Sequence, residues 1–416
     1  MAKIKDTLLD LNPWWKAEFE IEYVERDIYE EIKKFIALPQ ILAFTGLRRV
    51  GKTILMLKIA YDIIKEGLDK KNVIYFSFDE FRDVEIRSVI HEYEQIMDRH
   101  FAKGKYLLLL DEIQKLDSWE DQLKGIYDLF GKNVKIIISG SESLFIRKKS
   151  KETLSGRIFE FKIELLSFNE FLLFRGIDFK LKGLYEKELQ KLFNDYMFTM
   201  GFPELVDVRE KEVIRKYVAE SIVEKIVFKD IPTLFGIKDI SVIDTLLRIV
   251  MEEPGQIVEL SNLADELRIS RQTLSNYLFY LEESFLLKKL YNYSKSRRKV
   301  ERKLKKYYPT IISPDLLFRE DELSKSKVFE WLIVNRISSD FFWRDPYKNE
   351  VDIVLTDKSP IPVEIKYGKI EYSGLTAFSK RFKVNKGLVI SKATEEKKIH
   401  GDMTISIIPA FKFLME

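Results

Sequence analysis

One short stretch near the N-terminus constrains the fold of this chain more than any other feature. Residues 46–53 read GLRRVGKT and match G-x-x-x-x-G-K-[ST], a pattern in which backbone N–H groups surround phosphate oxygens. The apolar run QILAFTG leads into the stretch, and TILMLKIAYDII continues from it with apolar residues at helical spacing. A strand, a glycine loop and a helix in this order predict a parallel α/β sheet that binds nucleotide phosphates at the helix N-terminus.

Individual residues of this loop have predicted roles. Lys52 is expected to reach the terminal phosphates of ATP, and the hydroxyl of Thr53 is expected to bind Mg²⁺. The predicted nucleotide-binding residues are Gly46, Leu47, Arg48, Arg49, Val50, Gly51, Lys52 and Thr53. The two arginines occupy variable positions of the pattern and are equally suited to pair with acids or to contact a neighbouring subunit. A glycine turn without a ligand is the structural alternative.

A second apolar run supplies the carboxylates that nucleotide-bound Mg²⁺ requires. Residues 106–110 are apolar without alternation, which is typical of a parallel strand covered on both faces, and Asp111 and Glu112 follow directly. We expect Asp111 to hold Mg²⁺ through water and Glu112 to orient and deprotonate the attacking water. The second acid favours hydrolysis over passive nucleotide binding or a metabolic kinase.

A third apolar run, residues 134–138, ends in small hydroxyl residues. Ser139 is the candidate sensor of the γ-phosphate, because ATP hydrolases place a polar side chain at this strand end, and Ser141 lies behind it. Serines after a strand are also ordinary turn and N-cap residues. With an earlier strand at residues 72–80, the alternation of strands and helices predicts a parallel sheet.

These motifs resemble the AAA+ ATPases. GLRRVGKT, LLLLDEIQ and IISGSE, followed by LSGRIFEFKIELLSFNEFL and YMFTMGFPELV, are similar to a prokaryotic family in which the ATPase precedes a winged helix and a nuclease-like domain. The resemblance covers nearly the whole chain, and the ATPase motifs are its most specific part. It implies that Gly156 and Arg157 form the family's GR element, in which Arg157 senses or completes a nucleotide site of its own or a neighbouring chain. A structural salt bridge is equally compatible with Arg157.

Residues 254–290 predict a helix-turn-helix. Apolar residues recur at helical spacing on both sides of the tripeptide RIS, and Ser270 is the expected N-cap of the second helix. In a DNA reader the second helix enters the major groove. The side chains that it would offer to bases and phosphates are Arg271, Gln272, Ser275 and Asn276. Winged helices also serve as protein-interaction or structural modules, so a protein partner is the alternative.

A basic segment overlaps the end of this region. Residues 288–306 contain ten basic side chains and one acid, Glu301, in a chain whose formal net charge is only +3. We expect a wing that contacts nucleic-acid phosphates. Its predicted contact residues are Lys295, Arg297, Arg298, Lys299, Arg302 and Lys303. A charged surface that is merely solvated is the alternative.

The C-terminal quarter of the chain contains a separate group of acids. Asp352 lies in the apolar run EVDIVL, and Glu364 and Lys366 lie on one face of a second predicted strand, PVEIK. Glu330 lies on a preceding predicted helix. The arrangement resembles the PD-(D/E)xK nucleases, which implies that Asp352 and Glu364 bind Mg²⁺ and that Lys366 stabilises developing negative charge. Pro362 stands close to this site, and both an active and a silent site are compatible with the sequence.

Length and composition limit the remaining possibilities. A chain of 416 residues exceeds one ordinary core, which predicts several domains. The absence of cysteine and the presence of only 3 histidines mean that metal chemistry must use carboxylates. No apolar run is long enough to span a bilayer and the first residues lack the apolar core of a signal peptide, so we expect a cytoplasmic protein with no membrane partner.

The expected domains follow from these motifs. They are an N-terminal segment, an AAA+ core, a helical lid, a winged helix-turn-helix and a nuclease-like α/β domain of the restriction-endonuclease type, at residues 1–30, 31–175, 176–245, 246–315 and 316–416.

The sequence therefore predicts an ATP-hydrolysing AAA+ protein that couples nucleotide state to DNA binding, with a C-terminal nuclease-like domain. The alternative is a nucleotide-regulated switch or scaffold that binds a protein partner and whose nuclease-like domain is silent. ATP and Mg²⁺ are the expected cofactors. The oligomeric state and the choice between DNA and RNA stay open.

Overall fold

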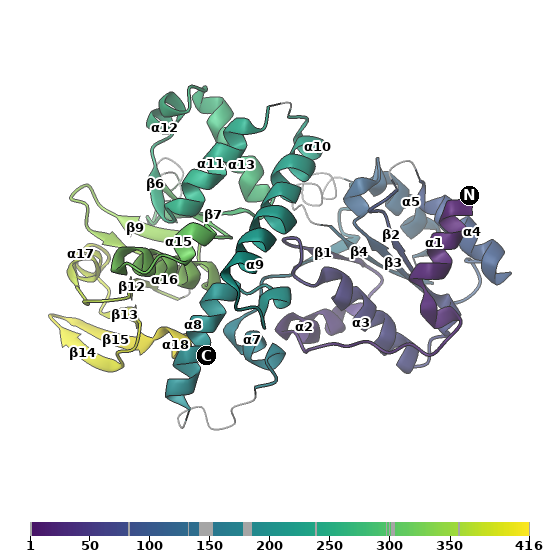
Figure 1. Ribbon diagram of the computed structural model, residues 1–416, viewed down its shortest axis with the longest axis horizontal. Helices are drawn as coiled ribbons and strands as arrows, with labels where there is room; N and C mark the ends of the chain where they lie inside the picture. The colour runs from purple at the N-terminus through teal and green to yellow at the C-terminus, as the bar shows by residue number, and fades with distance from the viewer. Residues whose placement is uncertain are drawn as a thin grey trace. The chain divides into compact units, whose positions relative to one another are not determined.

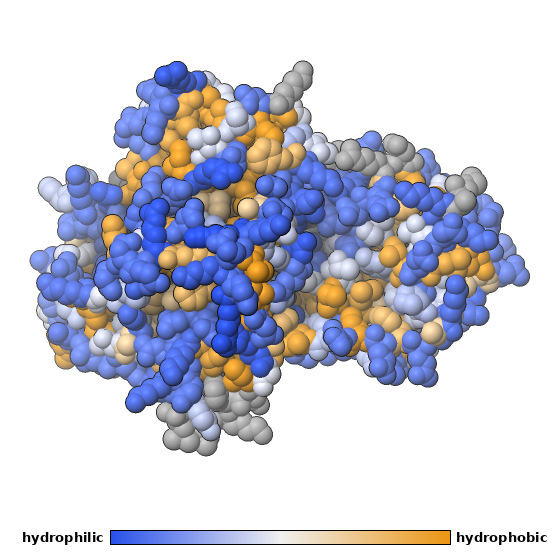
Figure 2. Space-filling view, viewed as in Figure 1, coloured by the Kyte–Doolittle hydropathy of each residue, from blue (hydrophilic) through white to orange (hydrophobic). Residues whose placement is uncertain are grey.

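The computed structural model contains two compact units, residues 1–165 and 166–416 (Figure 1). The visible face is mainly hydrophilic, with hydrophobic residues in smaller patches between the polar ones (Figure 2), as expected for a chain in which 33% of the residues are charged. None of the described helices is long and apolar enough to cross a membrane. The residues that the structure describes are 2–81, 84–131, 133–140, 153–177, 185–237, 239–296, 298, 300, 304–356 and 358–415.

A parallel sheet organises the first unit. Its described strands lie in the order β2-β3-β4-β1-β5, and each neighbouring pair is parallel. Parallel neighbours need crossover connections, and helices α3, α4 and α5 provide them. The elements are β1 (Ile41–Thr45), α3 (Lys52–Lys65), β2 (Val73–Ser77), α4 (Ile86–Met97), β3 (Tyr106–Asp111), α5 (Trp119–Phe130), β4 (Val134–Ser139) and β5 (Ile158–Lys162). The predicted parallel α/β sheet is confirmed.

The N-terminal segment covers the edge strand β2. The part that covers β2 contains α1 (Ala2–Leu11) and a short 3-10 turn (Pro13–Trp15), whereas α2 (Asp27–Ile36) packs its Phe35 against β5 at the other edge of the sheet. The side chain of Asn12 accepts from the backbone N–H of Tyr75 at 2.7 Å and donates to its carbonyl at 2.8 Å. The indole N–H groups of Trp14 and Trp15 both donate to the carbonyl of Val73, at 3.0 and 2.8 Å. These side chains satisfy backbone groups that an edge strand would otherwise expose.

Glycine is required where the loop leaves β1. Gly46 has φ +139°, and a Cβ atom there would lie 2.3 Å from the carbonyl oxygen of Ile163. The N–H of Ile163 in turn donates to the carbonyl of Thr45 at 2.7 Å, which keeps the two segments together. The close approach of the backbones therefore leaves no room for a side chain.

Helices dominate the first part of the second unit. Ser167 caps α7 through a reciprocal pair of hydrogen bonds with Glu170, the capping box. Two consecutive π-helical segments, η7 and η8, follow α9. The elements are α7 (Phe168–Phe174), α8 (Glu186–Thr199), a 3-10 turn (Pro203–Leu205), α9 (Lys211–Lys216), η7 (Tyr217–Val223), η8 (Ile226–Asp230) and α10 (Ile231–Phe235).

The helix-turn-helix region continues into a mixed sheet. Strands β6, β8 and β7 are antiparallel neighbours, and β9 pairs with β7 in parallel. The sheet order β10-β9-β7-β8-β6 therefore joins the two regions that we separated at residue 315. The elements are α11 (Ser241–Glu252), β6 (Gln256–Val258), α12 (Leu260–Glu266), α13 (Arg271–Glu283), β7 (Leu287–Asn292), β8 (Lys305–Pro309), α15 (Pro314–Leu317), α16 (Glu322–Arg336), β9 (Phe341–Arg344) and β10 (Glu350–Val351).

A third sheet completes the second unit. Its order is β11-β12-β13-β15-β14, with β12, β13 and β15 parallel and both outer strands antiparallel to their neighbours. Asp352 alone separates β10 from β11, so the chain passes from one sheet to the next at this residue. The elements are β11 (Ile353–Thr356), β12 (Pro360–Lys366), α17 (Ser373–Phe382), β13 (Lys386–Ser391), β14 (Glu396–His400), β15 (Met403–Pro409) and α18 (Ala410–Phe413).

Gly46→Ala is expected to destabilise the first unit by about 3 kcal/mol or more, because it adds a steric overlap to backbone strain. Gly67→Ala is the matched control, since Gly67 has φ +106° with no atom within 4 Å of the added Cβ. That change should cost only about 1–2 kcal/mol. Urea unfolding of the nucleotide-free protein measures both losses. Equal losses would contradict the close approach at Gly46.

Candidate functional site

The carboxyl ends of the central strands bring the predicted magnesium ligands together. The Asp111 carboxylate at the end of β3 accepts hydrogen bonds from the hydroxyls of Thr53 at 2.6 Å, Tyr75 at 2.8 Å and Ser139. Thr53 lies in the first turn of α3, and Ser139 ends β4. Hydroxyl and carboxylate oxygens are suitable ligands for Mg²⁺, so this group of side chains fits the ion that ATP carries.

Lys52 lies inside the loop that precedes α3. Its side chain is buried, and Nζ donates to the carbonyl oxygens of Gly46 and Leu47, both at 2.9 Å. The loop also contains left-handed backbone at Arg49 (φ 64°) and Gly51 (φ 97°). The ammonium group is therefore held among the backbone groups expected to surround phosphate.

Glu112 follows Asp111 in a left-handed conformation, with φ 54°. Its N–H donates to Asp111 Oδ1 at 3.1 Å and to Ser139 Oγ at 3.3 Å. Gln114 Nε2 donates to Glu112 Oε2 at 2.6 Å and so orients the carboxylate. A left-handed non-glycine residue costs backbone energy, and such strain is concentrated at functional sites.

Arg26 contacts the predicted phosphate-binding loop, although no sequence motif indicates it. Its buried guanidinium donates from Nη1 to the carbonyl of Val50 at 2.7 Å and from Nη2 to the carbonyl of Glu164 at 2.8 Å. It thereby joins the N-terminal segment to the loop and to the residues that follow β5. Tyr75 and Gln114 are likewise absent from the sequence prediction, because their partners are distant in the chain or outside the motif.

Arg157 lies where β1 and β5 begin, at the opposite ends of these strands from the loop. Its carbonyl accepts from the N–H of Ile41, where β1 begins, whereas the loop follows the end of β1. At about 3.3 Å per residue, the length of β1 separates the two by roughly 15 Å. Arg157 Nε pairs with Asp128 Oδ1 at 3.1 Å. The expected role in the nucleotide site of its own chain is thus corrected to a salt bridge, and a role in a neighbouring chain's site stays a prediction.

The helix-turn-helix residues lie as the sequence suggested. The Ser270 hydroxyl accepts from the N–H of Thr273 at 3.0 Å, which confirms the N-cap of α13. Leu274, Leu278 and Leu281 are buried on one face of this helix. The predicted contact residues Arg271, Gln272 and Asn276 are exposed, and Ser275 is half-buried. Gln272 Nε2 donates to Asn276 Oδ1 at 3.0 Å.

The basic segment has fewer surface charges than its composition suggests. Lys288 Nζ donates to the carbonyls of Val334 and Ile337, both at 2.7 Å, and Lys289 pairs with Glu282 at 2.6 Å. Lys306 is buried. Lys295 and Arg298 are exposed. The predicted contact residues Arg297, Lys299, Arg302 and Lys303 lie outside the described residues.

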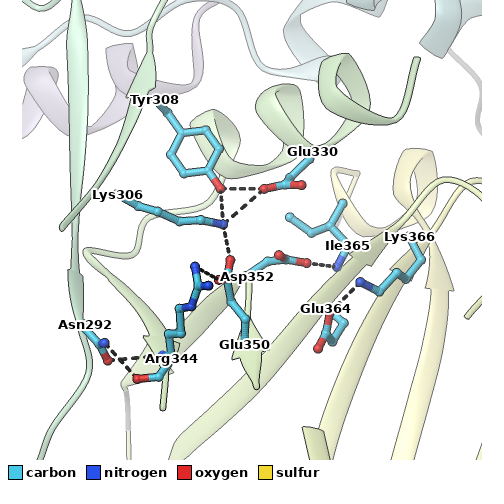
Figure 3. Close-up of polar contacts among 10 residues, drawn as sticks. All are labelled: Asn292, Lys306, Tyr308, Glu330, Arg344, Glu350, Asp352, Glu364, Ile365 and Lys366. Carbon is cyan, nitrogen blue, oxygen red and sulfur yellow. Dashed lines mark hydrogen bonds and ion pairs between the residues drawn. The ribbon is translucent and has the colours of Figure 1, made fainter. Parts of the chain in front are cut away.

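The C-terminal acids form one cluster (Figure 3). Glu330 projects from α16, Glu364 and Lys366 from β12, and Asp352 lies between β10 and β11. Glu364 Oε2 pairs with Lys366 Nζ at 2.8 Å, and Asp352 Oδ2 accepts from the N–H of Ile365 at 2.8 Å. The topology therefore gathers the side chains that the sequence placed on separate elements.

Further residues of the cluster are absent from the sequence prediction. Lys306 Nζ lies 2.6 Å from Glu350 Oε1 and 3.5 Å from Glu330 Oε1. The Tyr308 hydroxyl donates to Glu330 Oε1 at 2.6 Å. The sequence prediction counted Lys306 within the basic segment, because nothing in the sequence distinguishes it from its basic neighbours.

Burial dominates the electrostatics of the cluster. Burial raises the pKa of Glu364 to about 8, helped by the negative charge of Asp352 and opposed by Lys366. Burial also raises the pKa of Glu330, although Lys306 opposes it. For Lys306 burial favours the neutral form, but Tyr308 and the nearby acids outweigh it and raise the pKa well above its ordinary value.

The acids of this cluster are already bonded to protein groups. Across the described residues, no group of three or more His, Cys, Asp or Glu side chains is arranged to hold a metal ion. Glu330 bonds to Tyr308 and Lys306. Asp352 accepts from the backbone N–H of Ile365, and Glu364 pairs with Lys366. The predicted Mg²⁺ ligation by Asp352 and Glu364 involves only two acids and stays a prediction, although each of them already bonds to a protein group.

The sheet, the loop and the Asp111 group together define the first unit as a P-loop α/β domain. Residues 38–172 match a family described as AAA domain, while residues 190–310 and 328–413 match two domains of unknown function, DUF8612 and DUF4143. The first unit is therefore similar to AAA-type P-loop domains, and most of the second unit matches the two domains of unknown function.

Two relatives match different shares of this chain. An uncharacterized protein of Haemophilus influenzae is 27% identical and covers 65% of this chain and 67% of its own length. An uncharacterized protein of Methanocaldococcus jannaschii is also 27% identical and covers 99% of this chain and 92% of its own length.

Similar solved structures include the ADP form of the Aeropyrum pernix ORC2 protein, with 12% identity, a TM-score of 0.37, and coverage of 76% of this chain and 97% of that one. AMPPCP-bound DnaA from Aquifex aeolicus has 16% identity, a TM-score of 0.30, and coverage of 64% and 90%. At these TM-scores neither similarity bears on function.

Glu364→Gln is expected to remove a pH dependence of stability. Folded Glu364 keeps its proton up to about pH 8, whereas the unfolded chain releases it near 4.5, so wild-type stability should fall as pH rises between these values. The loss should be roughly 4–5 kcal/mol over this pH range, at about 1.4 kcal/mol for each pKa unit. Thermal unfolding in EDTA from pH 5 to 8.5 measures it, with the exposed strand residue changed in Glu396→Gln as control. A wild-type slope that persists in Glu364→Gln would contradict the burial effect.

Proposed function

We propose that this protein hydrolyses ATP and uses the nucleotide state to control nucleic-acid binding by its second unit. The observation that carries the first part is the Asp111 carboxylate, to which Thr53, Tyr75 and Ser139 all donate. This arrangement joins the helix after the loop to the ends of β3 and β4 and to the middle of β2. The buried Lys52 precedes Thr53 in the same helix.

In the proposed mechanism each residue acts on a specified part of the reaction. Lys52 Nζ would leave the Gly46 and Leu47 carbonyls and bond to phosphate oxygens when ATP binds. Thr53 and Asp111 would hold Mg²⁺, which when bound would supply positive charge against the developing charge of the phosphate oxygens. The Glu112 carboxylate, oriented by Gln114, accepts a proton from the attacking water.

Ser139 supplies the proposed γ-phosphate sensor. Its hydroxyl bonds to Asp111 and its Oγ accepts from the N–H of Glu112. A change at the γ-phosphate that moves Ser139 would thus move both acids together.

For nucleic-acid binding we propose a winged helix formed by α11 to β8. Its support is the capped helix α13, which exposes Arg271, Gln272 and Asn276, and the hairpin β7–β8, whose connection contains the exposed Lys295 and Arg298. Exposed basic side chains beside a helix-turn-helix suit phosphate contacts. A protein partner on the same surface is the second candidate.

For the C-terminal region we propose a nuclease-like domain that does not cleave nucleic acid. The convergence of Asp352, Glu364 and Lys366 supports the likeness to PD-(D/E)xK nucleases, but each acid is engaged by a protein group. DNA cleavage by wild type that Asp352→Ala abolishes would overturn this proposal.

Glu112→Gln should bind ATP and lower its turnover by about 100-fold or more, because the base is lost while the loop is intact. Lys52→Ala should abolish binding or turnover. Steady-state phosphate release and nucleotide binding measure the two steps, with the exposed acid changed in Glu85→Gln as control. Equal turnover in wild type and Glu112→Gln would remove the assigned role of Glu112.

Lys295→Gln combined with Arg298→Gln should weaken DNA binding and flatten its salt dependence by about one unit of slope for each phosphate that the protein no longer neutralises. The matched control is Lys397→Gln combined with Lys398→Gln on the exposed strand β14. Binding isotherms over a range of salt concentrations measure the slope. An unchanged slope would mean that these side chains are merely solvated and would favour a protein partner.

A further inference from the structure

We infer that Lys306 is the resident cation of the C-terminal carboxylate cluster and takes the place of a divalent metal there. The inference rests on the proposed non-cleaving character of this region and adds the physical reason for it. The basic segment of the sequence predicts an exposed Lys306, but this lysine is buried in the structure.

The position of Lys306 is that of a cation between carboxylates. Its side chain extends from β8 towards Glu330 on α16 and Glu350 on β10 (Figure 3) and is only 6% exposed. An ammonium group has three N–H donors. Their acceptors are Glu350 Oε1 at 2.6 Å, the Tyr308 hydroxyl at 3.1 Å and Glu330 Oε1 at 3.5 Å. The ammonium group is therefore well satisfied by the protein.

The carboxylates around Lys306 have additional protein donors. Tyr308, which is fully buried, donates its hydroxyl to Glu330 Oε1 at 2.6 Å. The other oxygen of Glu350 pairs with Arg344 Nη1 at 3.3 Å. Asn292 bonds to both the N–H and the carbonyl of Arg344, at 3.2 and 2.9 Å, which holds this arginine in place.

The remaining acids have their own partners. Asp352 stands where the chain changes sheets, and it satisfies the N–H of Ile365 on β12. Glu364 pairs with Lys366. Lys306 lies between Glu330 and Glu350, Arg344 pairs with Glu350, and Lys366 bonds to Glu364, so each of these three acids has a basic protein partner. A divalent ion would have to displace Lys306 or suffer its repulsion in a buried setting, where charges interact strongly.

Lys306 also links elements that are distant in the sequence. It follows Lys303, the last predicted contact residue of the basic segment, by only three positions, and it ties β8 to α16 and β10. Breaking a buried pair by removing one partner leaves an uncompensated charge and is strongly destabilising. The ammonium therefore stabilises this joint without a metal.

The test is a comparison of the nucleotide-free, full-length wild type and Lys306→Met in EDTA and in millimolar Mn²⁺. Wild type should unfold at the same temperature in both. Lys306→Met should unfold at a lower temperature in EDTA, and Mn²⁺ should restore at least half of the loss, because the acids then lack their cation. Lys305→Met on the same strand is the control and should be indifferent to Mn²⁺.

Electron paramagnetic resonance of Mn²⁺ with the wild type gives a result even if Lys306→Met does not fold. Wild type and Asp352→Asn should bind Mn²⁺ equally. Loss of a wild-type Mn²⁺ site in Asp352→Asn, or a folded Lys306→Met that ignores Mn²⁺, would overturn the inference. Neither measurement uses ATP or nucleic acid, so failure here is distinct from failure of the proposed ATPase, nucleic-acid or cleavage assignments.

Discussion

The carboxylate of Asp111 is the group on which the nucleotide site depends. Hydroxyls from α3, β2 and β4 all donate to it, through Thr53, Tyr75 and Ser139. Strand β3 lies between β2 and β4, so a single buried acid at its carboxyl end can accept from side chains of both neighbouring strands and of α3. Asp111 and Ser139 also position Glu112, because both accept from its backbone N–H.

The two acidic sites of the chain balance their charge in different ways. Asp111 receives bonds from neutral hydroxyls, which leave its negative charge available to a magnesium ion. Glu330 and Glu350 instead surround the ammonium of Lys306, which supplies positive charge from within the protein. A carboxylate that is already paired has less to offer a metal, and this contrast separates a site suited to catalysis from one suited to holding elements together.

Much of the nucleotide site could be predicted, because its residues are grouped in the chain. The loop, Thr53, Asp111 and Ser139 follow strands whose apolar runs identify them, and all lie at one sheet edge. Arg26 and Tyr75 escaped prediction, because their partners are distant in the chain and only the fold brings them near. Gln114 lies only two residues from its partner Glu112, but it is outside the motif that the prediction used. In the C-terminal cluster the acids were predicted as a group, but their protein partners were not.

By itself the sequence determined the local elements: the glycine loop, the buried strand before Asp111 and the Ser270 cap, since each depends on residues within a few positions of one another. Only the tertiary structure decided what distant side chains do. The register of β1 and β5 places Arg157 where these strands begin, away from the loop. The pairing of β8 with β7 places Lys306 in a buried cluster, although its neighbours in the sequence form a basic run. The sequence shows that residues 288–306 are basic, but only the position of each residue in the sheet and its connection leaves Lys295 exposed and Lys306 buried.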